Sequence, residues 1–169
     1  MTQKQSSQHE IAPAEAKARA WEMMEKLDFA MYTTRKGNSL KARPMSTIVK
    51  SDEGKIYILT HSTGDAVAET RAEMNVLLSY GNGSNKFVAT QAKAELSHDK
   101  GLIKRLWNPG AQAFWPDGPD KSDVTAIVLS PVAAEFWDGP GGIAGTAKFI
   151  YGLATGSVPD MGDNAAVRL

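Results

Sequence analysis

The chain has 169 residues, of which 42% are apolar, and its 19 basic residues balance its 19 acidic ones. This length corresponds to one domain, and zero net charge gives no bulk attraction to nucleic acid or to an anionic membrane. The absence of cysteine excludes disulfides, thiolate catalysis and cysteine metal sites. We expect one cytoplasmic globular domain over residues 11–169, after a flexible polar tail of residues 1–10 without a signal peptide.

The first regular element expected is an amphipathic helix over residues 13–27, "PAEAKARAWEMMEKL". Proline suits the first turn of a helix, where its missing N–H would have no partner. Trp21, Met24 and Leu27 fall on one face with Ala20, and the other face carries charge pairs four residues apart. The apolar face is predicted to pack on the core.

Short segments rich in β-branched and aromatic residues follow, a composition typical of strands. Turn sequences such as "KGNS", "SDEG" and "GNGS" separate several of them. Short strands joined by tight turns favour an antiparallel sheet that closes on itself as a barrel. The expected strands are residues 29–35, 40–50, 55–60, 75–81, 86–96, 123–130 and 132–138, the last two separated by Pro131.

Three further helices are expected, over residues 64–74, 99–107 and 142–154. Asp99 has the residue type of an N-cap for the second of them. The C-terminal residues 155–169 are expected to form a loose tail.

Residues 107–123, "WNPGAQAFWPDGPDKSD", combine two tryptophans and a phenylalanine with three prolines. Proline fixes its own φ and removes a backbone donor, so it interrupts regular hydrogen bonding. We expect an irregular segment whose aromatic side chains cover an apolar surface.

Several chemical motifs are absent or incomplete. His9, His61 and His98 are far apart, form no H-x-x-x-H pair and have no set of carboxylates beside them, which argues against a zinc site. The chain has neither a G-x-S-x-G nucleophile elbow nor a G-x-x-x-x-G-K-[ST] phosphate loop. Residues 139–144, "GPGGIA", fit a dinucleotide fingerprint, but the second βαβ half is missing, so a glycine-rich turn is preferred.

In residues 59–69, "LTHSTGDAVAE", a predicted strand runs directly into a predicted helix. The free N–H groups of a helix start can bind a phosphate. Alternatively, Ser62 and Asp65 only cap their own helix, and the Asp65 carboxylate would repel an anion.

Residues 41–47, "KARPMST", read as a strand, place Lys41, Arg43, Met45 and Thr47 on one face. Such a face suits a partly buried polar ligand. An exposed strand with cations lying along its surface explains it equally well.

Six stretches together resemble one family: "RPMST", "YILTHSTGDAVAE", "NVLLSY", "FVATQAKAEL", "LWNPGAQAFWPDGPD" and "LSPVAAEFWDG". Over roughly residues 13–165 the chain is similar to the pyridoxamine 5′-phosphate oxidase-like, FMN-binding split-barrel proteins, in particular their general stress protein branch. The resemblance implies a mainly β fold with flanking helices: a six-stranded antiparallel split β-barrel that forms a homodimer. Two FMN sites would lie at the subunit interface.

The resemblance also implies which residues hold the flavin. One subunit would flank the ring and ribityl chain, with the turn at residues 62–67 near the phosphate; its residues are Arg43, Met45, Ser46, Thr47, Thr60, His61 and Ser62. The partner would contribute Lys86, Phe87 and the segment 107–115 with Trp107 and Trp115, and Trp137 would approach the flavin.

This arrangement offers a role for the aromatic segment. Trp107, Phe114 and Trp115 would close over the neighbouring subunit's barrel and the mouth of its cofactor site, where their burial would contribute strongly. Alternatively, they plug the open end of their own barrel.

The chain departs from the family at several positions. Asp65 and Ala66 stand where members often carry a lysine or an arginine–lysine pair for the phosphate, which leaves Arg43, Lys41 and Lys86 as cations. Ala92 replaces a common glycine, and "DGPGGIAG" replaces the arginine–histidine segment that holds the substrate of vitamin B6 oxidases.

True pyridoxamine phosphate oxidase activity is therefore not expected. The resemblance favours an FMN-binding oxidoreductase-like protein whose chemistry lies on the flavin, with an unidentified substrate and no assignable catalytic residue. Two alternatives stay open: a non-catalytic split-barrel module that binds or senses a flavin or another ligand, and a structural stress protein without a cofactor.

Overall fold

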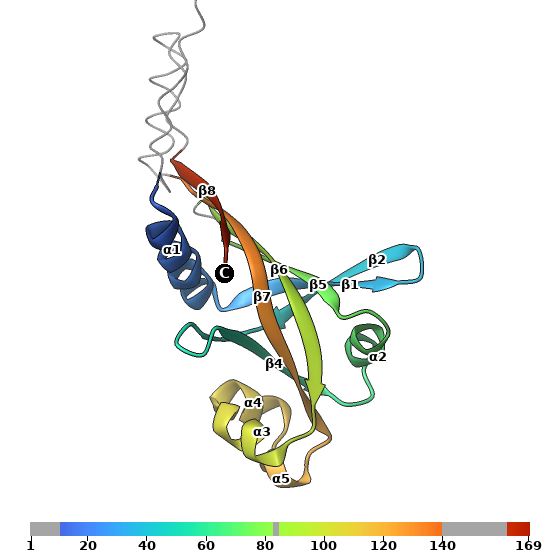
Figure 1. Cartoon of the computed structure of the whole chain (residues 1–169). Helices are drawn as coiled ribbons and strands as arrows, with labels where there is room; N and C mark the ends of the chain where they lie inside the picture. Colours follow the sequence, from blue (N-terminus) through green and yellow to red (C-terminus); the bar gives the residue numbers. More distant parts are fainter. Residues whose placement is uncertain (1–10, 83–84, 140–161) are drawn as a thin grey trace, which may run out of the picture.

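The computed structural model describes residues 11–82, 85–139 and 162–169, and about half of these residues belong to one antiparallel sheet (Figure 1). The strand order is β2-β1-β5-β6-β7-β4-β3, with β8 added beside β7. The strands are β1 (Phe29–Lys36), β2 (Ser39–Ser46), β3 (Ile48–Lys50), β4 (Lys55–His61), β5 (Asn75–Asn82), β6 (Lys86–Ser97), β7 (Val124–Asp138) and β8 (Asp163–Arg168).

Helices flank the sheet, with α1 beside β8 and with α3, α4 and α5 gathered at the opposite end (Figure 1). They are α1 (Pro13–Leu27), α2 (Asp65–Ala72), α3 (Lys100–Leu106), α4 (Pro109–Phe114) and α5 (Gly118–Lys121). None of these described helices is long and apolar enough to cross a membrane.

The sheet curls into a barrel that stays open along one line. β2 pairs with β1 at one edge, whereas β3, which follows β2 after a single residue, pairs with β4 at the other edge. Residues 39–50 therefore act as one bent strand that joins the two edges, so that β1, β2 with β3, and β4 to β7 make six barrel strands. β2 and β4 are not paired with each other in the described sheet. The predicted split barrel is confirmed.

Thr47 fixes the bend between β2 and β3, where a single strand over residues 40–50 was expected. Its backbone N–H donates to the carbonyl oxygen of Asp28 at 2.8 Å, and its hydroxyl donates to the same oxygen at 2.9 Å. Asp28 follows α1 and has a φ of 52°, a left-handed conformation that the surrounding structure must hold. The end of α1 and the bend thus stabilise each other.

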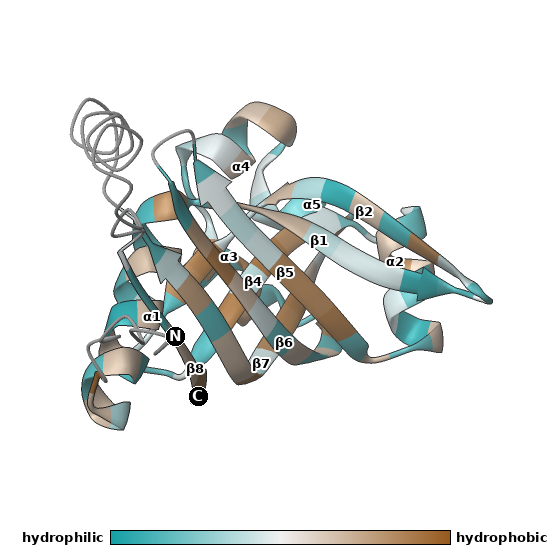
Figure 2. Cartoon of the chain, turned by 90° about the horizontal axis from the view of Figure 1, so that it is seen from above, coloured by the Kyte–Doolittle hydropathy of each residue, from teal (hydrophilic) through white to brown (hydrophobic). Residues whose placement is uncertain are grey.

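Alternate strand residues form the core inside the barrel. In Figure 2, β5, β6 and β7 lie side by side and carry hydrophobic stretches, and buried residues alternate with less buried ones along β5 and β6. Tyr32, Leu78 and Phe136 are completely buried there. As predicted, α1 adds its apolar face, including Trp21 and Met24, to this core.

A second, smaller cluster lies beneath α3. Ile103 and Leu106 pack against Tyr57, Val124 and Ala126 of the barrel. The predicted cap of this helix is confirmed, because the Asp99 carboxylate accepts a hydrogen bond from the backbone N–H of Leu102 at 2.5 Å. This cluster gives the following segment a surface on which to pack.

Three expectations about proline and the C-terminus were wrong. Residues 107–123 were expected to be irregular, but α4 and α5 form there, because a proline in the first helical turn loses no hydrogen bond. Pro131 was expected to divide two strands, but β7 is continuous and a register shift between Gln91 and Ala92 of β6 accommodates the proline. Residues 155–169 were expected to be loose, but Asp163–Arg168 pairs with β7 as β8.

The expected helix over residues 142–154 and the tail of residues 1–10 lie outside the described residues.

The buried side chain of Phe136 is predicted to carry a large share of the barrel's stability. Phe136→Ala is expected to lower the free energy of unfolding by about 3–5 kcal/mol, because it leaves a cavity in the core. Phe114→Ala, at a ring that is 78% exposed, is the matched control and is expected to change it by less than about 0.5 kcal/mol. Urea unfolding followed by tryptophan fluorescence measures both; equal losses would contradict the core assignment.

Candidate functional site

The opening in the barrel carries a cleft of about 370 Å³, within the range of small-molecule sites. We call it the split cleft. It lies between the ends of β2 and β4 and beneath α4, and its lining is mostly apolar. The lining residues are Phe29, Pro44, Met45, Ser46, Ile48, Leu59, Thr60, His61, Asn108, Gly110, Ala111, Phe114 and Trp115.

The first wall comes from β2. Arg43 and Met45 share the inward face as predicted, since they lie opposite Tyr32 and Ala30, which are buried. Thr47 does not continue this face, because β2 ends at Ser46 and the chain bends there. Met45 therefore lines the cleft from inside the barrel.

The second wall is the end of β4. β3 accompanies β4 only as far as Tyr57, whereas β7 pairs with it up to His61. Leu59, Thr60 and His61 consequently form an edge without a strand partner on the cleft side in the described sheet. This edge places a hydroxyl and an imidazole at the rim of an apolar cavity.

Ser62, next along the chain, turns away from the cleft. Its hydroxyl bonds to the Thr125 hydroxyl at 2.7 Å, and Thr125 in turn contacts Nδ1 of His98 at 2.9 Å. The expectation that Ser62 and Asp65 cap α2 was wrong. Gly64 occupies the N-cap position, and no side chain makes a capping hydrogen bond to the start of the helix.

The aromatic segment forms the roof. The Trp115 ring meets the His61 ring edge to face, with 5.1 Å between centroids, and Trp115 Nε1 donates to His61 Nδ1 at 3.3 Å. A neutral His61 in this arrangement carries its proton on Nε2. Trp107, whose ring centroid lies 6.1 Å from that of Trp115, donates to Oε1 of Gln112 at 2.9 Å.

The packing of this roof supports one of the two interpretations offered above. Trp107 and Trp115 pack against the second cluster of their own chain, as the plug interpretation requires. Phe114 remains 78% exposed at the mouth of the cleft. Only Phe114 is therefore left with most of its surface available to another molecule.

Of the predicted residues that do not line the cleft, three lie together near the start of β6. Phe87 and Trp137 are cross-strand neighbours on the outward face of β6 and β7 and are 46% and 43% exposed. Phe29, at the cleft and 61% exposed, points to the same outward face of β1. We call Phe29, Phe87 and Trp137 the aromatic row. Lys86, the remaining predicted residue in this region, is not part of the row and forms an ion pair with Asp138.

An ion pair between a partly exposed arginine and a buried glutamate dominates the electrostatics beside the cleft. Arg43 pairs with Glu69 of α2, whose side chain is 5% exposed. The hydroxyl of Thr34 donates to the same carboxylate at 2.5 Å. This hydrogen bond, together with Arg43, holds the pKa of Glu69 below its ordinary value despite burial. Sequence reasoning missed Glu69, because a glutamate within a short polar helix carries no pattern that indicates burial.

The other candidate cations are paired or remote. The Asp138 carboxylate accepts both Lys86 and Arg19, and these two contacts keep its pKa low although burial opposes them. Lys41 lies on the exposed β1–β2 hairpin. No lysine or arginine of the described residues lines the split cleft.

These residues fit one end of FMN and not the other. The apolar walls, with hydroxyls and an imidazole at the rim, suit a flat heteroaromatic ring. A phosphate dianion needs charge-assisted partners, but Arg43 is already paired with Glu69, and Asp65 places a further carboxylate at the start of α2. The phosphate end therefore does not fit.

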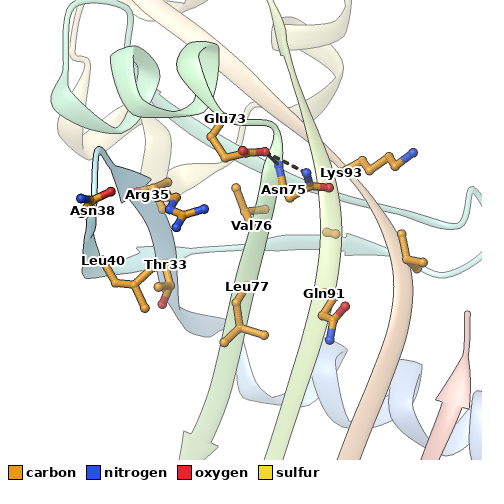
Figure 3. Close-up of a pocket in the computed structure, with 13 residues that line it drawn as sticks. Thr33, Arg35, Asn38, Leu40, Glu73, Asn75, Val76, Leu77, Gln91 and Lys93 are labelled. Atoms are coloured by element: carbon orange, nitrogen blue, oxygen red, sulfur yellow. Dashed lines mark hydrogen bonds between the residues drawn. The ribbon is translucent and has the colours of Figure 1, made fainter.

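A larger surface groove of about 680 Å³ lies elsewhere, on the outward side of β1, β5 and β6 (Figure 3). Its charged side chains are Arg35, Glu73 and Lys93, and Glu73 accepts hydrogen bonds from the Asn75 backbone and side chain at 2.9 and 2.8 Å. None of the predicted flavin-binding residues lines this groove. The split cleft is the better candidate because it combines apolar walls with converging polar groups.

The geometry defines a class of protein, a split β-barrel with a ligand-sized cleft where its two edges fail to meet. The chain belongs to the pyridoxamine 5′-phosphate oxidase-like family, whose model matches residues 15–160. The resemblance seen in the sequence is thereby confirmed. None of the curated proteins compared with the chain matches it.

Solved structures share the fold. A Jannaschia sp. CCS1 structure named for general stress protein 26 is 22% identical, with a TM-score of 0.78 over 94% of this chain and 100% of that one. The general stress FMN/FAD binding protein of Xanthomonas citri is 20% identical, with a TM-score of 0.68 over 77% and 93%. A Clostridium acetobutylicum protein related to general stress protein 26 is 18% identical, with a TM-score of 0.66 over 75% and 90%.

The Glu69 carboxylate is predicted to make stability depend on pH. Because its pKa is lowered in the folded chain, its contribution is present above the ordinary value of 4.5 and is lost as pH falls through the folded value. Glu69→Gln is expected to cost about 1–3 kcal/mol at pH 7, and this difference should shrink towards pH 3.

Denaturation at a series of pH values measures this effect. Other carboxylates contribute to acid unfolding, so the quantity that matters is the difference between wild type and variant. Glu95→Gln, at an exposed carboxylate on β6, is the matched control and should follow the wild type closely. A Glu69→Gln deficit that is the same at both pH values would contradict the ion pair.

Proposed function

We propose that this chain binds a flavin ring in the split cleft of a homodimer and serves oxidoreduction by the bound flavin. The observation that carries this proposal is that residues expected to touch a flavin come together in one cavity. Of the residues expected to touch a flavin, Met45, Ser46, Thr60, His61 and Trp115 come from three separate segments and line one cavity. The name of the Xanthomonas citri structure, which refers to FMN/FAD binding, supports the same conclusion.

The chemistry would belong to the flavin, which accepts and donates hydride when bound. The chain's part would be to bind the ring between apolar walls and to exclude water from it. The Thr60 and Ser46 hydroxyls and the His61 imidazole are the polar groups at the cleft available to orient it.

A second candidate function is ligand binding without turnover. One observation favours it: among the described residues that line the cleft, His61 is the only titratable side chain, and it is held by Trp115. A flavin that NADH and NADPH cannot reduce would identify such a sensor or carrier. Reduction by either nucleotide, followed by reoxidation in air, identifies the oxidoreductase.

Filling the cleft is predicted to abolish flavin binding. Ser46→Trp places an indole at an exposed position on the cleft wall and is expected to weaken riboflavin binding at least about tenfold. Ser39→Trp introduces the same side chain at the exposed far end of β2 and is the matched control. Quenching of flavin fluorescence in a titration measures both.

The outcomes of this titration are distinct. Loss of binding in Ser46→Trp alone supports the split cleft as the site. Equal binding by both variants places the ligand elsewhere, for example in the surface groove of Figure 3. No binding by the wild-type chain contradicts flavin binding itself.

The aromatic row supports the homodimer. Phe87 lies over Gly81 of β5, since a Cβ at Gly81 would come within 2.8 Å of the Phe87 ring. Gly81 therefore leaves room for the ring between β1 and β6, and the row of Phe29, Phe87 and Trp137 runs across the outward face from the cleft towards β7. Large exposed aromatics in contiguous positions mark interaction surfaces. We propose that a second copy of this chain covers the aromatic row. The row begins at the cleft, so a subunit bound there would also border the proposed flavin site.

A charge within the aromatic row is predicted to separate the subunits. The wild-type chain is expected to sediment at twice its 18.2 kDa, and Phe87→Glu is expected to raise the dimer dissociation constant at least about tenfold, because the charge would be desolvated at the interface. Leu40→Glu, at a 73% exposed position on the β1–β2 hairpin, is the control. A wild-type chain that sediments as a monomer, or a Phe87→Glu variant that stays dimeric, would reject this surface.

A further inference from the structure

Resting on the proposed function, we infer that the split cleft selects a flavin without a phosphate, such as riboflavin, over FMN. The inference concerns the surroundings of Arg43, which lies on β2 next to the cleft. Met45 lines the cleft, and Arg43 lies two residues further along the same inward face of β2, about 7 Å away. A ligand whose ring lies against Met45 and whose tail follows β2 would therefore reach Arg43 first.

Arg43 cannot offer a free positive charge to such a tail. Its guanidinium is paired with Glu69, which is nearly inaccessible to water and also accepts the Thr34 hydrogen bond. Arg43 Nη1 could still donate to a phosphate oxygen, but the charge of Arg43 is already balanced by Glu69. Turning the whole guanidinium towards a phosphate would remove the ion-pair partner of a buried carboxylate, which is strongly unfavourable. Glu69 thus already occupies the place of an anion beside Arg43.

The start of α2 does not replace this charge. The first helical residue is Asp65, so an acidic side chain already stands at the positive end of the helix dipole. Asp65 lies one helical turn before Glu69 on α2, and Glu69 already takes up the charge of Arg43. A phosphate dianion placed here would be repelled by both carboxylates, although the exposed Lys36 is another cation that acts on Glu69 through space and helps to lower its pKa.

The same place retains one feature that suits an uncharged tail. Arg43 Nη1 is buried and has no hydrogen-bond partner, although the guanidinium is charge-balanced. A donor of this kind gains a hydrogen bond from any neutral acceptor, such as a ribityl hydroxyl, without displacing Glu69. An uncharged polyol therefore fits where a phosphate does not.

The remaining cations do not change this conclusion. Lys86 and Arg19 both bind Asp138, and Lys41 lies on the exposed hairpin. If the second subunit brought Lys86 near the flavin, its ammonium would arrive already paired.

Parallel titrations of the purified full-length chain with riboflavin and with FMN test the inference. The wild-type chain is expected to bind riboflavin at least about tenfold more tightly than FMN, which corresponds to one unfavourable charge interaction. Glu69→Gln removes the competing carboxylate and is expected to shift the ratio towards FMN by about tenfold or more. Glu73→Gln makes the same charge change just beyond the other end of α2 and is expected to leave the ratio unchanged.

The possible results separate the two proposals. FMN binding as tight as riboflavin binding, or tighter, in the wild-type chain overturns this inference and leaves flavin binding intact. Binding of neither flavin contradicts the proposed function, and the inference with it. If Glu69→Gln does not fold, Asp65→Asn, at an exposed position, provides a second removal of negative charge, and its ratio should move in the same direction.

Discussion

The bend at Thr47 is the constraint on which the rest of the structure depends. Because residues 39–50 pair with β1 at one end and with β4 at the other, a single strand closes the sheet, and closure is necessarily incomplete. The incomplete part is the cleft, and its walls are the strand ends on either side of the bend. Two hydrogen bonds from Thr47 to Asp28 hold this geometry from the end of α1. The cavity thus follows from backbone pairing, with side chains deciding what it accepts.

Beside the cleft, Arg43 and Glu69 are the residues on which the proposed preference for an uncharged ligand rests. The guanidinium and the carboxylate satisfy each other inside the barrel end, with the Thr34 hydroxyl as a third partner. A buried pair of this kind is not needed for stability, since apolar side chains can replace it. The pair instead affects ligand binding. Arg43 can still donate a hydrogen bond, but Glu69 neutralises its positive charge. The same position could serve an anion only if the residue facing it from α2 were neutral.

The sequence was sufficient for the family, the barrel, α1 and the cap at Asp99, because periodicity, turn residues and short motifs are local signals. Resemblance also brought together Met45, Thr60 and His61, which are distant in the chain. Other features depend on tertiary contacts. The bend at Thr47 needs Asp28, the continuity of β7 through Pro131 needs a register shift in β6, and the burial of Glu69 needs Arg43. None of these partners is adjacent in sequence, so no local pattern could reveal them.

The cleft and the aromatic row share Phe29, whose ring is 61% exposed, and this shared residue links the two proposals physically. In the proposed dimer, a second subunit would cover the side of Phe29 that faces the row, while a ligand would cover the side that faces the cleft. Each partner would then order a side chain that the other also contacts, so binding of one would favour binding of the other by the same free energy. The open barrel would thus be completed by a ligand and a subunit together, with Trp107 and Trp115 closing it only from their own side.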